Sequence, residues 1–307
     1  MTPITTLDGL LDSLRHAPSR TVAVAAGEDP NSIQAAARAV AEDIAKVTLV
    51  GDRARILELC AEHGLDAGAF AIVHEPDMAQ AARTARDLVR TGEAEVLMKG
   101  LVSTADYMRA ILDKEQGLMP AGGVLSHVTV LELPAYRERH GKLLFVGDVA
   151  IIPKPDLETK RRILRYCVDA AHSFGIVKPR AALIAASEKV SPKMEATVEA
   201  RAIRDESGDA FADAIVDGPL ALDVALSPEA CAIKGLDSPV GGAADVLVFP
   251  NIESGNVFYK AGTLLSGGRL AAAVVGTTAP CVLTSRADSE ESKLLSIALG
   301  CRLAGGR

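Results

Sequence analysis

Tryptophan is absent from this 307-residue chain, and all aromatic residues together make up only 3% of it. Hydrophobic residues nevertheless reach 49%, so the core must consist mainly of Ala, Val, Ile and Leu. Long hydrophobic runs are also missing, since the longer ones, such as residues 270–276, are much shorter than the ~18 residues that a membrane span needs. The N-terminus shows no basic segment followed by an apolar one, so no signal peptide is visible. We therefore expect a soluble, cytoplasmic protein.

Cysteine is scarce and scattered. The chain has five cysteines, an odd number, and no C-x-x-C pair, which argues against a disulfide framework or a metal cluster and fits a reducing compartment. Each cysteine stands in an apolar stretch, where it is best interpreted as a small buried hydrophobic residue. The net charge of −7 argues against a protein that coats nucleic acid, but it does not exclude a small anionic ligand.

Motifs that define several common enzyme classes are absent as well. No G-x-G-x-x-G follows the first predicted strand, and no G-x-S-x-G, H-E-x-x-H or cluster of His with carboxylates occurs. Residues 262–268 have the glycine spacing of a P-loop, but Gly268 occupies the position of the required Lys. A Rossmann dehydrogenase, a P-loop NTPase, an α/β-hydrolase and a zinc protease are therefore all disfavoured.

Short apolar runs alternate with helical patterns along most of the chain, which predicts βαβ units and a mostly parallel sheet. The middle differs, because a β-prone segment at 124–133 is closed by Pro134. We predict two α/β/α domains with a cleft between them, the first formed by 1–133 with 280–307 and the second by 134–279. Ligands of open α/β sheets bind beyond the carboxyl ends of the strands, so the loops after strands are the places to search for chemistry.

The first such loop follows the strand predicted at 96–98. Lys99 precedes a glycine turn, and Ser103-Thr104 then opens a helix. The free N–H groups of a helix start, together with a Lys, make a good anion site. On this segment alone, a plain helix cap at Ser103 with a solvated Lys99 is the favoured explanation.

A second polar helix start follows the strand predicted at 245–249, and Ser254 is predicted to begin this helix. Gly255 lets backbone approach a ligand closely, while Asn256 and Lys260 share one helix face. A plain cap explains Ser254 but not its polar neighbours. We therefore favour a ligand site formed by Ser254, Gly255, Asn256 and Lys260.

The third segment, 284–289 (TSRADS), follows an apolar strand. Arg286 should project into the cleft, where a guanidinium can bind an oxyanion through two hydrogen bonds. Asp288 with Glu291 matches a capping box, so one carboxylate is both a candidate base and a predicted helix cap.

Weaker candidates also lie near predicted strands. A lone His in a β-prone segment is more often packed than catalytic, and turn chemistry alone would place Asp148 and Asp217 where they are. These weaker candidates are Ser126-His127, Asp148, Glu188-Lys189 and 217–220.

Together these segments resemble the phosphate acetyltransferase and phosphate butyryltransferase family. The matching stretches are collinear and cover about the whole chain: LMKGLVST (97–104), LSH (125–127), FVGDVAIIP (145–153), DGPLALD (217–223), KGLDSP (234–239), ADVLVFPNIESGNVFYK (244–260) and VLTSRADSEESKLLSIAL (282–299). The forms KGLVST and TSRADS resemble the butyryl branch and its close acetyl-type relatives. The longer classical acetyltransferases usually read L-S-R-G in the last motif, so the acyl group stays open between acetyl and butyryl.

The resemblance implies reversible transfer of a short acyl group between coenzyme A and inorganic phosphate. It also implies a two-domain fold like that of isocitrate and isopropylmalate dehydrogenases, a dimer or larger homo-oligomer, and no metal or permanently bound cofactor. By position, Ser285 and Arg286 match the catalytic Ser-Arg pair of the family, and Asp288 is the nearest candidate for its catalytic Asp. Ser254, Gly255 and Asn256 match its S-G-N ligand loop.

We expect acyl-CoA and phosphate to react directly in a ternary complex. Lys99 and the two helix starts would hold the phosphate, and Arg286, assisted by Ser285, would stabilise the oxyanion of the tetrahedral intermediate. Asp288 would act as base toward the thiol of coenzyme A in the reverse direction. The competing route is an acyl-cysteine at Cys281, whose strand position predicts burial.

Two other classes of function stay open at this point. A metal-dependent hydroxyacid dehydrogenase on the related fold would need a cluster of carboxylates, and none is visible. A non-catalytic protein that binds acyl-CoA or acyl phosphate would not need the intact Ser285-Arg286 pair.

Overall fold

The structure is a computed structural model, and it describes residues 2–284 and 288–305. Internal contacts divide the chain into two compact units, which we describe separately. Unit 1 contains 2–6 and 126–270, and unit 2 contains 7–125 with the described part of 271–305. The junctions lie at 125/126 and 270/271, whereas the sequence predicted 133/134 and 279/280. The first differs because the strand that starts at Ser126 pairs with a strand of unit 1.

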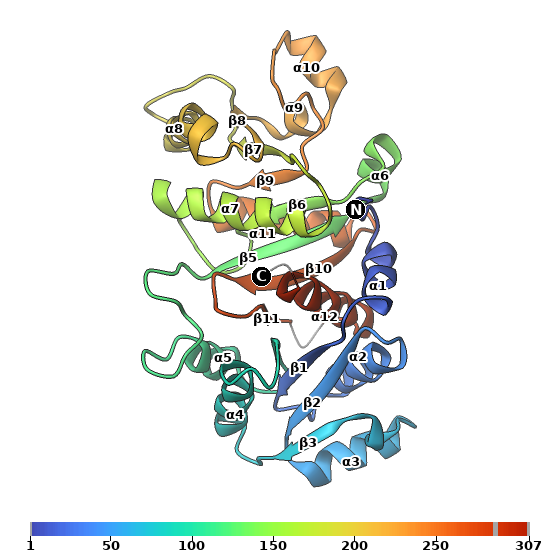
Figure 1. The fold of residues 1–307 in the computed structure, drawn as a ribbon. Coiled ribbons are helices and arrows are strands. Elements are labelled where there is room, and N and C mark those ends of the chain that lie inside the picture. The colour runs from blue at the N-terminus through green and yellow to red at the C-terminus, as the bar shows by residue number, and fades with distance from the viewer. Residues whose placement is uncertain (1, 285–287, 306–307) are drawn as a thin grey trace. The chain divides into compact units, whose positions relative to one another are not determined.

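The sheet of unit 2 has the strand order β3-β2-β1-β4-β11-β10 (Figure 1). The first five strands are parallel to one another, and only the pairing of β11 with β10 is antiparallel. All four residues of β4 are buried, so both faces of the sheet are covered there. The strands are β1 (Arg20–Ala25), β2 (Ala45–Gly51), β3 (Ala71–His74), β4 (Val96–Lys99), β10 (Arg269–Val275) and β11 (Cys281–Val282).

Helices follow the parallel strands of unit 2, as the alternating pattern predicted. Asp29 caps the helix after β1 and Pro30 is its first residue, while Asp77 caps the helix after β3. The last helix packs against the first two helices of the unit. The helices are α1 (Leu7–Arg15), α2 (Pro30–Ala41), α3 (Arg53–Glu62), α4 (Met78–Arg90), α5 (Thr104–Ile111) and α12 (Glu290–Ala304), with a short 3-10 helix at Ala67–Ala69.

Unit 1 has the strand order β5-β6-β9-β7-β8, in which only β5 and β6 are antiparallel. In Figure 1, α7 lies along β6 and β9, against which it packs. The strands are β5 (Ser126–Glu132), β6 (Leu144–Gly147), β7 (Arg180–Ile184), β8 (Ile215–Leu220) and β9 (Val246–Val248). The helices are α6 (Pro134–His140), α7 (Leu157–Ser173), α8 (Glu195–Ala210), α9 (Leu222–Leu226), α10 (Pro228–Lys234) and α11 (Ile252–Leu264).

The mixed α/β fold with a mostly parallel sheet confirms the predicted fold class at this level. Aliphatic side chains dominate the core, as the low aromatic content required, and Tyr107, Phe145 and Phe174 are the aromatic residues that are fully buried. All five cysteines are buried and free, which confirms their interpretation as small core residues. Among the described helices, none is both long enough and apolar enough to cross a membrane.

Candidate functional site

Lys99 lies at the carboxyl edge of the sheet of unit 2, where the sequence predicted an anion site. It ends β4, its side chain is buried (4% exposed), and its Nζ donates to the carbonyl oxygen of Gly100 at 3.2 Å. The parallel neighbours β1 and β11 end at the same edge. A buried cation at this edge can attract an anionic ligand. The competing prediction, that the Lys99 side chain is solvated, is wrong.

Gly100 makes the turn after Lys99 because no side chain fits there. A Cβ atom at this position would lie 2.1 Å from the carbonyl oxygen of Ala26. The N–H of Gly100 donates to Ala25 at 2.8 Å, and that of Leu101 donates to Ala26 at 2.7 Å. Ala26 itself has a left-handed φ of 53°, which is uncommon for a residue with a side chain. The backbones after β1 and β4 are therefore held tightly together at the candidate site.

Ser103 caps α5, as the structural alternative proposed. Its Oγ accepts from the N–H of Asp106 at 3.1 Å and donates to the Asp106 carboxylate at 2.7 Å, while Thr104 is the exposed first residue of the helix. These contacts with Ser103 and the nearby Arg109 lower the pKa of Asp106. The Ser103 hydroxyl is thus bonded within the helix. A ligand at this helix start would therefore contact the backbone N–H groups of the helix.

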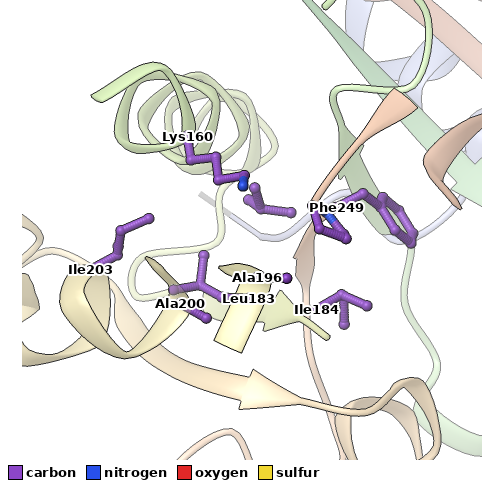
Figure 2. A pocket seen from close by; sticks show the side chains of 9 residues that line it. Lys160, Leu183, Ile184, Ala196, Ala200, Ile203 and Phe249 are labelled. Carbon is purple, nitrogen blue, oxygen red and sulfur yellow. The ribbon is translucent and has the colours of Figure 1, made fainter. Parts of the chain in front are cut away.

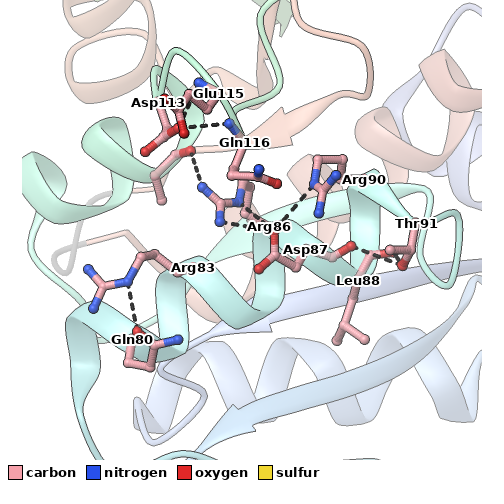
Figure 3. A network of polar contacts seen from close by, with 11 residues as sticks. Gln80, Arg83, Arg86, Asp87, Leu88, Arg90, Thr91, Asp113, Glu115 and Gln116 are labelled. Carbon is pink, nitrogen blue, oxygen red and sulfur yellow. Dashed lines mark hydrogen bonds and ion pairs between the residues drawn. The ribbon is translucent and has the colours of Figure 1, made fainter.

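Two buried polar contacts fix α5 over the sheet. The hydroxyl of Tyr107 donates to the carbonyl oxygens of Leu97 and Val282, at 3.0 and 3.2 Å, and so bridges β4 and β11. Arg86 of α4 is buried, pairs with Asp87 and donates to the carbonyl of Ala110 near the end of α5 (Figure 3). Both contacts hold α5 against its neighbours in unit 2.

The segment that carries the predicted catalytic residues is described in part. Ser285 and Arg286 lie outside the described residues. Asp288 is half-buried, and α12 begins beyond it at Glu290 with Ser289 as its cap, whose Oγ accepts from Ser292 N at 3.2 Å. The predicted capping box of Asp288 with Glu291 is therefore wrong, because Ser289 takes that position.

In unit 1, Asp148 organises the loop after β6. Its carboxylate is buried and accepts four hydrogen bonds: from the Ser126 hydroxyl at 2.9 Å and from the N–H groups of His127, Ala150 and Ile151 at 3.1, 2.7 and 2.8 Å. From the sequence, Asp148 and Ser126-His127 were separate weak candidates. In the structure they belong to one hydrogen-bond network.

His127 is a buried member of this network. Its Nδ1 lies 3.1 Å from the Thr129 hydroxyl. Burial lowers the pKa of His127, and the nearby Asp148 only partly opposes that shift. The side chain is thus a packed, hydrogen-bonded histidine, as its place in a β-prone segment suggested.

The second predicted ligand segment forms the start of α11, which packs on the loop of Asp148. The cap is Asn251, whose Oδ1 accepts from the N–H and the hydroxyl of Ser254 at 3.0 and 2.8 Å. The prediction that Ser254 begins the helix is wrong, because Asn251 caps the helix and its first residue is Ile252. Ser254 instead lies in the first turn.

Gly255 and Asn256 hold α11 against that loop. A Cβ atom on Gly255 would lie 2.8 Å from the carbonyl oxygen of Asp148, so only glycine allows this close approach. Asn256 Nδ2 donates to the carbonyl of Val149 at 3.0 Å. Lys260 is exposed one turn further on, with its Nζ 5.9 Å from the centre of the Tyr259 ring.

An open pocket of about 450 Å³ lies beside this helix start in unit 1. Two of its lysines are paired, Lys160 with Glu199 and Lys154 with Glu195 at 2.8 Å. Figure 2 shows Lys160 reaching from α7 into the small neighbouring pocket. The open pocket is lined by Pro153, Lys154, Lys160, Glu195, Ala196, Glu199, Pro250, Asn251 and Glu253.

The structure thus divides the predicted site residues between the two units. Unit 2 contains Lys99, Ser103, Thr104 and Asp288, and unit 1 contains Ser254, Gly255, Asn256 and Lys260. Within the described ranges, no group of three or more His, Cys, Asp or Glu side chains is placed to hold a metal ion. Sequence reasoning overlooked Asn251 and undervalued Asp148, although each follows a strand.

Polar helix starts and a buried lysine at the ends of parallel strands are typical of α/β enzymes that bind anionic substrates. Comparison with known proteins gives the family: the chain belongs to the phosphate acetyl/butaryl transferase family, whose model matches residues 6–87 and 75–301. It is 41% identical to a phosphate butyryltransferase of Clostridium acetobutylicum, over 99% of this chain and 100% of that relative.

Two further similarities agree with this family. A phosphate acetyltransferase of Thermotoga maritima is 36% identical over 96% of this chain and 98% of its own. The crystal structure of a branched-chain phosphotransacylase from Enterococcus faecalis superposes with a TM-score of 0.81 at 35% identity, covering 93% of this chain and 99% of that one.

Proposed function

We propose that this protein is a phosphate acyltransferase that converts acyl-CoA and inorganic phosphate into acyl phosphate and coenzyme A, reversibly. The observation that carries the proposal is the 41% identity to a phosphate butyryltransferase over 99% of the chain. The acyl group is short, and both butyryl and acetyl enzymes are among the relatives. Initial rates with acetyl-, propionyl- and butyryl-CoA in one assay decide between them.

In the proposed reaction, an oxygen of the phosphate attacks the thioester carbonyl carbon, and the C–S bond then breaks to release the thiolate of coenzyme A. Lys99 supplies a buried positive charge for the phosphate. Arg286 donates to the oxyanion of the tetrahedral intermediate with help from Ser285, a role that the match of the TSRADS motif supports. In the reverse direction, Asp288 takes the proton from the thiol.

Direct transfer between the two substrates is proposed over an acyl-enzyme. A cysteine nucleophile must be accessible and easily deprotonated, but all five thiols are buried. Burial raises the pKa of Cys301 to about 12 and that of Cys167 further still. Cys281 lies next to the motif on β11, with its Sγ 3.5 Å from the carbonyl oxygen of Ala279. Mass spectrometry after mixing with acyl-CoA alone should therefore find no acylated cysteine.

Release of coenzyme A with and without phosphate tests the function. We expect Arg286→Ala to lower the phosphate-dependent rate by at least about 100-fold with the fold intact. Arg109→Ala, which removes an exposed partner of Asp106, is the matched control and should keep the rate. Near-normal turnover of Arg286→Ala would remove Arg286 from the mechanism, and a wild-type protein that releases no coenzyme A would contradict the function itself. Reduction of a nicotinamide would instead support the dehydrogenase alternative.

We further propose that the two units are the two α/β domains of an isocitrate/isopropylmalate dehydrogenase-like fold, and that the chain works in the cytoplasm. The division of the internal contacts into two compact units supports two domains. The five free cysteines support a reducing compartment.

A homodimer or larger homo-oligomer is also proposed, with the outer face of α11 as the contact between copies. Val257 and Leu264 are seven residues apart on this face and are 68% and 81% exposed, and the adjoining Leu265 is 85% exposed. This spacing is typical of a helix face that packs against another surface. Glu253 and Lys260 are exposed on the same helix, so two copies in antiparallel arrangement would pair their opposite charges.

A further inference from the structure

Strand β11, which leads into the TSRADS segment, is short. It consists of Cys281 and Val282. Among the residues that the structure describes, it pairs with β4 at two positions and with β10 at one. The residue before it is Pro280, which has no N–H to donate. So short a ladder does little to fix β11 along β4, although Ser285 and Arg286 follow it in the chain.

Tyr107 of α5 adds a side-chain bond to this short ladder. Its side chain is fully buried, and its hydroxyl lies 3.0 Å from the carbonyl oxygen of Leu97 in β4 and 3.2 Å from that of Val282 in β11. One hydroxyl hydrogen is thus shared between the two neighbouring strands. Burial raises the pKa of Tyr107, and the Cys281 thiol beside it raises that pKa further. The hydroxyl therefore stays protonated near neutral pH and is always available as a donor.

Apolar packing on these strands cannot replace the bond from Tyr107. Helix α12 packs against β4 and β11, and a Cβ atom on Gly300 would lie 2.9 Å from Val96 Cγ1 and 3.2 Å from Val282 Cγ2. These contacts involve methyl groups, whose attraction has no preferred direction. A hydrogen bond has a preferred length and angle, so the hydroxyl of Tyr107 fixes how far β11 extends along β4.

We propose that Tyr107 is a positioning residue for the reaction: its hydroxyl fixes β11, and so the start of the segment that carries Arg286, relative to Lys99. The inference rests on the proposed function, in which Lys99 attracts the phosphate and Arg286 stabilises the oxyanion. Tyr107 does not contact a substrate in this role. It acts through the backbone of two parallel strands, one of which ends at Lys99. A displacement of about 1 Å at a reacting centre can lower a rate by about 100-fold, so the loss of this bond should affect turnover.

The variant Tyr107→Phe removes one oxygen atom and keeps the ring, so the chain should still fold. We expect its kcat to fall by about 10- to 100-fold, because the oxyanion that Arg286 stabilises exists only beyond the ground state. The KM values for acyl-CoA and phosphate should stay within about threefold of the wild-type values, since Lys99 belongs to β4 and does not depend on β11 for its place.

Tyr136→Phe is the matched control. Tyr136 is also buried, and its hydroxyl donates to the carbonyl oxygen of Ala244, but it belongs to α6 and to the core of unit 1. Both variants lose one buried hydrogen bond, so both should lower the midpoint of thermal unfolding by similar amounts. Rates measured below the unfolding midpoints of both variants should then show a loss of kcat in Tyr107→Phe alone.

A double-mutant cycle tests whether Tyr107 acts through Arg286. In the Arg286→Ala background, Tyr107→Phe should lower the remaining kcat by less than about threefold, because the group that it positions is already gone.

Four results would overturn the inference. They are losses of kcat that multiply in the double variant, a kcat of Tyr107→Phe within about twofold of the wild-type value, an equal loss in Tyr136→Phe, and a Tyr107→Phe chain that fails to fold while Tyr136→Phe folds. A wild-type protein without phosphate-dependent release of coenzyme A would contradict the proposed function instead, so the two failures are distinguishable.

Discussion

Replacing Asp148 by Asn should destabilise unit 1 although the two side chains have the same shape. In the native protein, Oδ1 accepts from Ala150 N and Ile151 N, and Oδ2 accepts from the Ser126 hydroxyl and His127 N. An Asn side chain offers one oxygen and one NH2 group. If its oxygen accepts from the two loop N–H groups, its NH2 group faces Ser126 and His127. The Ser126 hydroxyl can rotate and accept a hydrogen bond from this NH2 group. The N–H of His127 is a donor only, so it is left without an acceptor.

The structure sets the size of this effect. One buried N–H without an acceptor costs about 1–3 kcal/mol, and the bonds that remain lose the advantage of a charged acceptor, so we expect a total of about 2–4 kcal/mol. Activity should fall too, because the backbone at Asp148 and Val149 contacts Gly255 and Asn256 of α11. Asp148→Ala removes all four acceptors and should cost more.

Urea unfolding of Asp148→Asn and the wild-type protein measures this cost. The control is Asp156→Asn, since Asp156 is the exposed cap of α7, where Asp and Asn are about equally good. That control should stay within about 0.5 kcal/mol of the wild-type protein. If Asp148→Asn is as stable as the control, then the carboxylate does not organise the loop and the reasoning is refuted.

Three further predictions concern unit 2 and the outer face of α11. Lys293 Nζ lies in a buried site, where it donates to Asp29 at 2.8 Å and to Ser32 at 3.1 Å. Lys293→Met should therefore lower the free energy of unfolding by about 3–5 kcal/mol. A loss below about 1 kcal/mol would contradict this prediction. Burial alone would raise the pKa of Asp29, but the bond from Lys293 outweighs it and the pKa is lowered. The stability that it contributes is thus complete above about pH 4 and lost as the pH falls further, so wild type and Lys293→Met should converge in acid. Leu264→Glu should reduce the mass in sedimentation to that of one chain, whereas Leu57→Glu on α3 should not; an unchanged mass of Leu264→Glu excludes the proposed contact.

Much of the fold could be predicted because the pattern that encodes it is local. Helix caps such as Asp29 and Asp77 and the apolar strands between helices are visible in short stretches of sequence. The helix α1 was not predicted, although Leu7, Leu10, Leu11 and Leu14 have helical spacing and are all buried. The place of β11 between β4 and β10 has no local signal, since pairing of distant strands decides it.

The candidate site shows the same limit at the level of single residues. Ser254 and Asp288 both have the chemistry of a cap, but Asn251 and Ser289 compete for those positions, and the choice depends on where each helix meets the rest of its unit. Lys99 was correctly placed at a strand end.

The interleaved order of the two units affects how the chain folds during synthesis. Unit 1 is continuous from 126 to 270 apart from a few N-terminal residues, so it is synthesised before residues 271–305. Unit 2 must wait, because its strand β11 and helix α12 follow unit 1 in the chain. Until then, β4 is an open sheet edge with unpaired backbone groups, which other chains can extend. The nascent protein is therefore open to aggregation through β4 until β11 has been synthesised.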